Sequence, residues 1–238
     1  MIRIGSARID ERGKLTGGKA GDQTGKEVSE QNFYVHSKGW YIIRPRSEAH
    51  AAKIAERMQA ACANPNIGYD QNQRTGVIKN GIDSKTPTEC DCSALVRACV
   101  KEATGKDPGN FTTANEKGML LATGLFDSLT YKAGVQIYPG DILVTKSKGH
   151  TVICTQGPSR PKPVSYYPKC ASSYNSIVDA LMAVGEMNIT KSYRKNIAAA
   201  NGIRNYTGTA AENTKMLKLL KNGKLANAVP VITALRAG

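Results

Sequence analysis

Apolar residues recur at helical spacing in two segments of the first half of the chain. Residues 47–62 open with a serine, a common N-cap, and then repeat small and apolar residues on one side of a helix. Residues 92–104 also have helical spacing, and Gly105 follows as a stop signal. One side of this segment carries Leu95, Val96, Cys99, Val100 and Ala103, while Arg97, Lys101 and Glu102 lie elsewhere. We therefore expect helices at 47–62 and 92–104, and a further helix within 110–123.

Short runs of apolar and β-branched residues predict the strands. They lie at residues 32–35, 40–44, 141–145 and 151–155. The last two runs are separated by the turn-like residues Lys146 to Gly149, which predicts a hairpin. Helices packed against one side of a mainly antiparallel sheet make an α+β fold. We expect this fold for residues 1–157.

A proline-rich basic stretch separates a second region from the first. It runs from Gly157 to Pro168 and should be extended and semi-rigid, so we place a linker at 158–172. Three short helical patterns follow, each closed by glycine, at residues 176–185, 193–202 and 211–223. We expect residues 173–238 to form a small basic helical module. The alternative is a helical cap that completes the fold of the first domain.

The formal net charge of +14 is unevenly distributed along the chain. From Pro158 to Gly238, twelve Lys and Arg residues stand against Asp179, Glu186 and Glu212, which leaves +9 in the last third. This region should prefer an anionic partner, for which wall polymers, nucleic acid and anionic lipid are all candidates. No nucleic-acid-binding motif accompanies the charge and aromatic residues are sparse there, so we expect no nucleic-acid partner.

Composition also limits the membrane, export and cofactor chemistry that we expect. No run of 18 apolar residues occurs, which argues against stable membrane insertion, and the first residues lack the apolar core of a secretory signal. Six cysteines in a chain of this length without such a signal are expected to be free thiols. Cys90, Cys92 and Cys99 are spaced unlike zinc ligands and have no nearby histidine, so we expect no metal or other cofactor.

One cysteine and one histidine suggest nucleophilic catalysis. Cys92 opens the helix predicted at 92–104, where unpaired N–H groups and the helix dipole favour a thiolate and lower the thiol pKa. Only three histidines could act as its base, and His150 stands at the head of a predicted strand, where it would be held rigidly. His36 lies in a polar segment, and His50 lies on the helix predicted at 47–62. Taken singly, Cys92 could be a buried hydrophobe and His150 structural, but the combination favours a cysteine hydrolase.

Three short motifs around these residues resemble a known family. They are Asp91-Cys92-Ser93-Ala94-Leu95-Val96, Gly140-Asp141-Ile142-Leu143-Val144 and Gly149-His150-Thr151-Val152-Ile153. They look like the motifs of NlpC-type papain-like cell-wall peptidases, which are close relatives of the CHAP amidases and peptidases. The layout is similar to bacteriophage endolysins of Gram-positive, clostridial-type hosts, and the last third is similar to their wall-targeting modules. The resemblance implies a papain-like domain with its nucleophile at a helix N-terminus.

The resemblance also implies roles for individual residues. Cys92 would be the nucleophile and His150 the general base, while the hydroxyl of Tyr69 would lie near the developing oxyanion. Asp91 and Ser93 match the positions that hold the polar end of the substrate. Two structural alternatives stay open, because Asp91 could be a helix N-cap and Tyr69 a half-buried core residue. For Asp141 we favour a structural role in the turn before its strand.

The third member of the catalytic triad is missing from its usual position. In the family it lies on the strand after the base, and there this chain offers only Gln156, six residues beyond His150 and about 20 Å away along a straight strand. Asp22 or Gln23 from the polar N-terminal segment could fold back to orient the base, and a backbone carbonyl could also do so. Catalysis by the Cys–His pair remains possible without this residue, because the third member mainly fixes the imidazole tautomer.

The function that follows is amide hydrolysis in bacterial peptidoglycan. The resemblance favours a D-glutamyl endopeptidase, with an N-acetylmuramoyl-L-alanine amidase as the alternative. A non-catalytic wall-binding or phage tail protein and a transacylase are also open. Such a lysin would be made in the host cytoplasm without a signal peptide and would act on the wall after release. Its partners would be peptidoglycan and anionic wall polymers, and its oligomeric state stays open.

Overall fold

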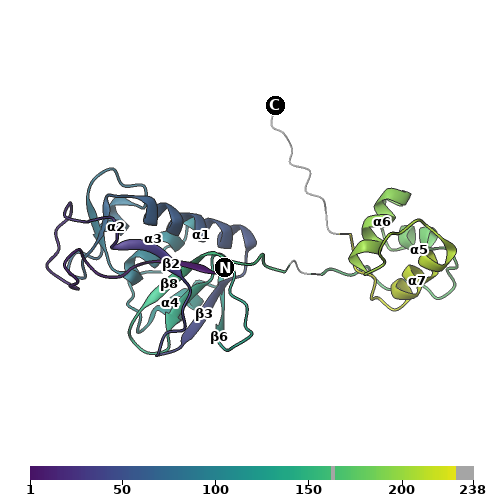
Figure 1. The fold of residues 1–238 in the computed structure, drawn as a ribbon. Helices are drawn as coiled ribbons and strands as arrows, with labels where there is room; N and C mark the ends of the chain where they lie inside the picture. Colours follow the sequence, from purple (N-terminus) through teal and green to yellow (C-terminus); the bar gives the residue numbers. More distant parts are fainter. Residues whose placement is uncertain (162–163, 229–238) are drawn as a thin grey trace. The chain divides into compact units, whose positions relative to one another are not determined.

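The structure is a computed structural model that describes residues 1–161 and 164–228 and divides into two compact units (Figure 1). Unit 1 is Met1–Arg160 and unit 2 is Pro161–Gly238. Residues 162–163 of the predicted linker and 229–238 of the predicted module lie outside the described residues.

Unit 1 is built on a six-stranded sheet in which every neighbouring pair is antiparallel. The strand order is β2-β1-β8-β7-β3-β6. With its helices this makes unit 1 an α+β domain with a mainly antiparallel sheet, as expected. The strands are β1 (Arg3–Ala7), β2 (Val28–Asn32), β3 (Trp40–Pro45), β6 (Phe126–Thr130), β7 (Ile142–Thr145) and β8 (Thr151–Gln156).

Strand alternation gives the sheet two apolar faces. Ile43, Ile142 and Ile153 belong to the large core that the helices cover. Their neighbours along the strands point the other way and, with Trp40 and Ile137, form a smaller core on the opposite face. Because both faces are buried, β7 and the first five residues of β8 contain no exposed position.

Helices α1 (Glu48–Ala63) and α3 (Cys92–Thr104) pack on one face of this sheet, and both were predicted from their spacing. Ser47 caps α1 through a hydrogen bond from the His50 N–H, and Gly105 ends α3 with a positive φ of 71°. Two shorter helices complete unit 1, α2 (Gly76–Asn80) and α4 (Glu116–Ala122), and α4 lies within the range expected for it.

A two-stranded parallel ribbon directly precedes the start of α3. It consists of β4 (Ile67–Tyr69) and β5 (Thr88–Cys90), with Ile67 opposite Thr88 and Tyr69 opposite Cys90. Since α3 begins two residues after Cys90, the ribbon brings Tyr69 and the first turn of α3 to the same end.

One strand prediction is wrong, and the central strand β1 was not predicted. The strand expected at 32–35 is instead β2, which ends at Asn32. The aromatic side chains that suggested it pack sideways, Phe33 edge-on to Tyr131 at 5.3 Å and Tyr34 edge-on to Trp40 at 5.9 Å. Strand β1 was not expected, because its sequence contains only one large apolar residue, Ile4.

Unit 2 contains three helices, α5 (Ile177–Ala183), α6 (Lys191–Ala200) and α7 (Ala210–Lys221). Each has a hydroxyl N-cap, from Ser176, Thr190 and Thr209 respectively, and a glycine of positive φ lies just beyond each C-terminus. Their apolar faces meet in one core, which also takes in Tyr167 and Cys170 from the range that we assigned to the linker. Tyr167 is held there by a backbone hydrogen bond to Leu225.

Candidate active site

The site is built around the first turn of α3. Asp91 is the N-cap, and its carboxylate accepts a 2.6 Å hydrogen bond from the Ala94 N–H. Cys92 is therefore the first residue of the helix, as the sequence predicted, and it is 9% exposed. Its side chain sits at the edge of the large core and not deep inside it.

The sulfur of Cys92 lies against the beginning of β8. The backbone N–H groups of Thr151 and Ser93 are within hydrogen-bonding reach of it and lower its pKa. Burial, followed by the charges of Asp91 and Glu116, outweighs these groups and raises the pKa of the thiol to about 12. The expected lowering of this pKa is thus wrong for this state of the protein, because burial and two carboxyl groups oppose the helix N-terminus.

Glu116 is a component of the site that the sequence did not reveal. It is the first residue of α4 and is fully buried, and its Oε1 accepts a 2.6 Å hydrogen bond from the Thr151 hydroxyl. Its Oε2 is buried without a partner among the described residues. Burial raises the pKa of this carboxyl to about 8. A glutamate in the first turn of a helix is common, so the sequence pattern gave no reason to single it out.

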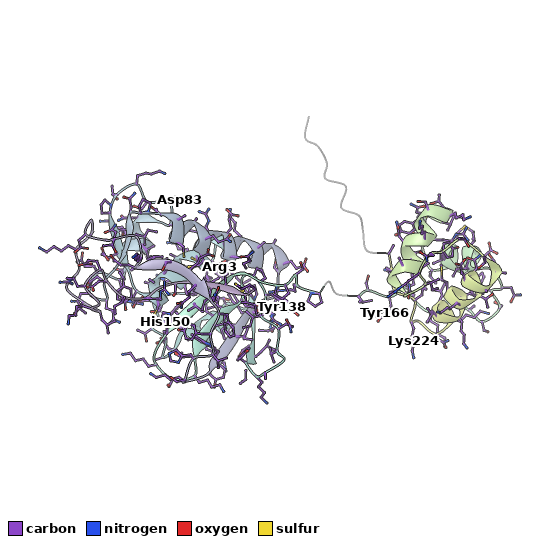
Figure 2. All side chains as sticks on the ribbon, in the orientation of Figure 1. Arg3, Asp83, Tyr138, His150, Tyr166 and Lys224 are labelled. Atoms are coloured by element: carbon purple, nitrogen blue, oxygen red, sulfur yellow. The ribbon has the colours of Figure 1, made fainter. Side chains whose placement is uncertain are left out.

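His150 lies immediately before β8, on the first unit, where Figure 2 labels it. Its backbone is tied to Thr145, whose hydroxyl accepts from the His150 N–H at 2.9 Å. Burial, with smaller contributions from the charges of His36 and Arg8, lowers the pKa of the imidazole to about 4. Among the described residues, its Nε2 is buried without a hydrogen-bond partner. The imidazole is therefore neutral at physiological pH.

The structure brings Cys92 to the backbone of His150 but does not join the two side chains. Strand alternation places the imidazole on the side of β8 that carries Val152, whereas the Thr151 side chain faces Glu116. No hydrogen bond links the imidazole to the Cys92 sulfur within residues 1–161 and 164–228. The catalytic pairing of these residues stays a prediction.

Tyr69, at the end of β4, lies near Cys92. It is 3% exposed, and its hydroxyl accepts a 3.0 Å hydrogen bond from the Gln71 amide. Burial raises the pKa of the phenol to about 12, and the nearby charges of Cys92 and Asp91 contribute to that rise. The hydroxyl is therefore protonated at neutral pH and available as a hydrogen-bond donor.

Asp91 and Ser93, expected to contact substrate, are engaged inside the protein. The Ser93 hydroxyl donates to Asp91 at 3.0 Å, and Arg74 donates to Asp91 at 2.5 Å and to Ser93 at 2.9 Å. Arg74 also reaches the Phe111 carbonyl at 2.6 Å. Arg74, which the sequence analysis missed, thus ties the first turn of α3 to the loop before α4. A substrate-binding role for Asp91 and Ser93 stays a prediction.

The two residues proposed to orient the base lie in the loop between β1 and β2. Asp22 accepts a 2.9 Å hydrogen bond from the Lys19 N–H. The Gln23 amide donates to the Pro65 carbonyl at 3.2 Å. The bond of Gln23 ties this loop to the residues before β4, and neither Asp22 nor Gln23 forms a hydrogen bond with His150 in the described part of the chain.

Asp141 has the structural role that we favoured. It is completely buried and accepts hydrogen bonds from Arg44 at 3.0 and 2.7 Å and from the Tyr138 N–H at 2.9 Å. The preceding Gly140 has a φ of 85°, and a Cβ there would overlap the Ala51 carbonyl on α1. The Gly-Asp turn thus fixes the approach of β7 to α1.

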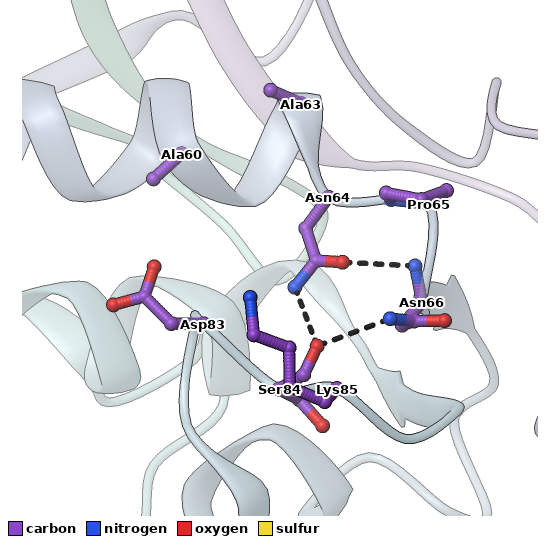
Figure 3. Close-up of a pocket in the computed structure, with 8 residues that line it drawn as sticks. All are labelled: Ala60, Ala63, Asn64, Pro65, Asn66, Asp83, Ser84 and Lys85. Atoms are coloured by element: carbon purple, nitrogen blue, oxygen red, sulfur yellow. Dashed lines mark hydrogen bonds between the residues drawn. The ribbon is translucent and has the colours of Figure 1, made fainter.

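A cavity of about 390 Å³ lies at the other end of the β4–β5 ribbon (Figure 3). Its wall includes Asn64 and Asn66, whose amides both donate to the Ser84 carbonyl, together with Asp83 and Lys85. These residues precede the two strands, whereas Cys92 follows them. The cavity is therefore separate from the sulfur.

In residues 1–161 and 164–228 no group of three or more His, Cys, Asp or Glu side chains is arranged to hold a metal ion. None of the helices in this part of the chain has the length and apolar character needed to cross a bilayer.

Comparison with known proteins gives one positive result. A family model described as "Endolysin-like domain" matches residues 4–160, which is 157 of the 238 residues and nearly all of unit 1. No curated protein and no solved structure matches the chain.

Proposed function

The chain belongs to the endolysin-like domain family, and from this premise we propose that unit 1 hydrolyses peptidoglycan with Cys92 as its nucleophile. Family membership supports action on the bacterial cell wall. The observation that carries the cysteine chemistry is the place of the sulfur, at the start of α3 and within reach of the N–H groups of Ser93 and Thr151. Those groups favour negative charge on the sulfur once substrate displaces the thiol from its buried state.

The proposed reaction is acyl transfer to water. The thiol of Cys92 gives its proton to the imidazole of His150, and the sulfur attacks the carbonyl carbon of a stem-peptide amide. N–H groups at the start of α3 and the phenol of Tyr69 donate hydrogen bonds to the resulting oxyanion. The imidazolium then protonates the leaving amine, the C–N bond breaks, and water hydrolyses the thioester to regenerate the thiol.

The role of His150 as the base requires a change in its surroundings. With a pKa of about 4 the imidazole is unprotonated at neutral pH but only weakly basic, so substrate binding must raise its pKa and lower the pKa of about 12 of the Cys92 thiol before the proton can move. Because the imidazole lies on the side of β8 that carries Val152, its turn toward Cys92 requires the backbone at the start of β8 to rearrange. No hydrogen bond at Nε2 is lost in this turn, because that atom has no partner among the described residues. In this proposal substrate binding accompanies the turn, and the buried thiol and neutral imidazole form the resting state.

The finer assignments follow the family resemblance. The fold is papain-like, and the bond cut is the one after D-glutamate, with the muramoyl–L-alanine amide as the alternative. Asp91 and Ser93 shape the end of the substrate site through their bonds to Arg74. Unit 2, which is rich in lysine, binds the wall, and the protein acts there after release from the cell that makes it.

The proposal is tested by removing the sulfur of Cys92 and measuring whether the protein still clears a suspension of bacterial walls. Cys92→Ala should abolish the fall in turbidity of a suspension of Gram-positive walls, with its circular dichroism spectrum unchanged. Cys62→Ala is the matched control, because Cys62 is also a free thiol whose pKa is raised to about 12 by burial, but it lies on α1. Full activity of Cys92→Ala would contradict the proposal.

Burial of the sulfur favours a second candidate function. A site with a protonated thiol and an imidazole turned away would also suit a wall-binding protein that has no catalytic step. Such a protein would sediment with walls and release no fragments, whatever residue stands at position 92. Fragment release by the unmodified chain excludes this candidate.

A further inference from the structure

Unit 2 contains a cavity of its own, of about 250 Å³, between its three helices. Its polar lining consists of Asn175 and Ser176 before and at the start of α5, Arg194 in the first turn of α6, and Asn213 and Thr214 on α7. The remaining wall is apolar and comes from α5 and α7. All lining residues belong to one unit, so the cavity is defined by that unit alone.

Arg194 is the only cation in this lining, and it lacks a partner. Its Nε is buried without a hydrogen bond, and it forms no ion pair within the described residues. A buried guanidinium N–H without an acceptor costs free energy, which an anionic oxygen of a ligand would recover. The Nε–H group of Arg194 is therefore unsatisfied in the described part of unit 2.

The nearest acidic side chain on α7 is already in use. Glu212 accepts hydrogen bonds from the backbone N–H groups of Thr207, Gly208 and Thr209, at 3.2, 2.9 and 2.8 Å. These bonds lower the pKa of its carboxyl and hold it at the helix cap. No carboxylate lines the cavity in the described part of unit 2, so the charge of Arg194 is not balanced there.

The volume of the cavity and the charge of Arg194 together limit which chemical groups can bind there. A cavity of about 250 Å³ is smaller than a site for a drug-sized molecule, so it fits one terminal group and not a polymer segment. One planar guanidinium matches one carboxylate in bidentate fashion, and the neighbouring amides and hydroxyls suit the amide bonds next to it. A polyphosphate chain carries many charges and would instead follow the exposed lysines.

We propose that this cavity binds a free carboxylate of a peptidoglycan stem peptide through Arg194. The proposal rests on the wall-directed function given above and names the group that unit 2 recognises. The carboxylate oxygens accept hydrogen bonds from the guanidinium, and Asn175, Ser176 and Thr214 contact the adjoining peptide.

The test uses the full chain carrying Cys92→Ala, so that walls stay intact during the measurement. Arg194→Gln in this background should bind purified walls about tenfold more weakly, the value of one charged hydrogen-bonded contact. Lys195→Gln is the matched control, because it removes the same charge from the next position, which is exposed and outside the lining, and it should change binding less than twofold. Asn175→Asp places a like charge at an exposed lining position that tolerates substitution, and it should weaken binding as well.

Competition identifies the group that is bound. The synthetic peptide L-Ala-γ-D-Glu-L-Lys-D-Ala-D-Ala with free carboxylates should displace the protein from walls, and its fully amidated form should not. Equal competition by the two peptides, displacement by poly(glycerol phosphate) alone, or unchanged binding of a folded Arg194→Gln chain would each overturn the proposal.

Hydrolysis supplies a separate readout. With Cys92 present, Arg194→Gln should slow the digestion of intact walls, whereas Lys195→Gln should not. If the unmodified chain digests no walls, the proposed catalytic function is wrong. The proposal for Arg194 is then still tested by the binding measurements, which do not depend on hydrolysis.

Discussion

The two units of this chain differ in what they bury. In the described residues every buried Asp, Glu, Ser and Thr side chain belongs to unit 1, whereas unit 2 buries apolar, tyrosine and cysteine side chains only. Buried ionisable groups reduce stability unless they are paired, and they are commonly kept where they do chemistry. The difference agrees with the proposal that unit 1 carries the reaction chemistry and that the basic unit 2 serves recognition.

His150→Gln is the substitution in unit 1, apart from the nucleophile, with the largest expected effect. Glutamine cannot serve as a base, so kcat for muropeptide release should fall by about a hundredfold or more, with binding to walls unchanged. His50→Gln, on α1, is the control and should keep full activity. Equal rates for the two variants would place the base elsewhere in unit 1.

The buried carboxyl of Glu89 should make the stability of unit 1 depend on pH. Burial and the neighbouring charge of Glu27 raise its pKa to about 8, and both its oxygens lack partners among the described residues. Between the unfolded value near 4.5 and about 8, the unfolded chain loses this proton while the folded chain keeps it. The free energy of unfolding should therefore fall as pH rises through that window.

Glu89→Gln should remove this dependence. At pH 8 the variant should gain on the order of a few kcal/mol over the unmodified chain, and at pH 4.5 the two should be nearly equal. Urea unfolding followed by the fluorescence of Trp40 reports unit 1 alone, since it is the single tryptophan and is fully buried there. A gain that is the same at both pH values would show that Glu89 is not the titrating group.

Glu116→Gln should act on the sulfur and not on the fold. The side-chain amide of glutamine can still accept the hydrogen bond from the Thr151 hydroxyl. It lacks the negative charge of Glu116, which raises the pKa of the Cys92 thiol. At pH 9, where Glu116 itself is ionised, the variant should be faster by up to about tenfold, the equivalent of one pKa unit in the thiol. Below pH 7 the two rates should be alike. A uniform loss of rate at all pH values would indicate a purely structural role.

The smallest expected effect belongs to unit 2. Thr209 caps α7 in a capping box with Glu212, so Thr209→Ala should cost about 1 kcal/mol of its stability. The transition of unit 2, followed by circular dichroism, should shift, while the Trp40 transition stays in place. A shift of both transitions would mean that the two units unfold together.

Regular local patterns were predicted from the sequence better than buried polar groups. Apolar spacing and caps gave α1, α3 and the three helices of unit 2, because these elements follow from local rules at Ser47, Asp91 and Gly105. Cys92 was placed correctly at a helix start for the same reason.

The environment of the site depends on distant parts of the chain and could not be read locally. Glu116 and Arg74 reach the first turn of α3 from the regions around α4 and α2, and their sequence surroundings are ordinary. The raised pKa of the Cys92 thiol results mainly from burial, then from the charge of the adjacent Asp91, and then from the charge of Glu116, which lies 24 residues away. Local helix rules alone therefore predicted the position of the sulfur but the opposite pKa shift.

Mass spectrometry of muropeptides released from purified sacculi tests the central claim most directly. The unmodified chain should release fragments with new amino termini at the residue after D-glutamate, and Cys92→Ala should release none. Free L-alanine amines would instead identify the amidase with the same nucleophile. Fragment release by Cys92→Ala at the rate of the unmodified chain would contradict catalysis by this sulfur.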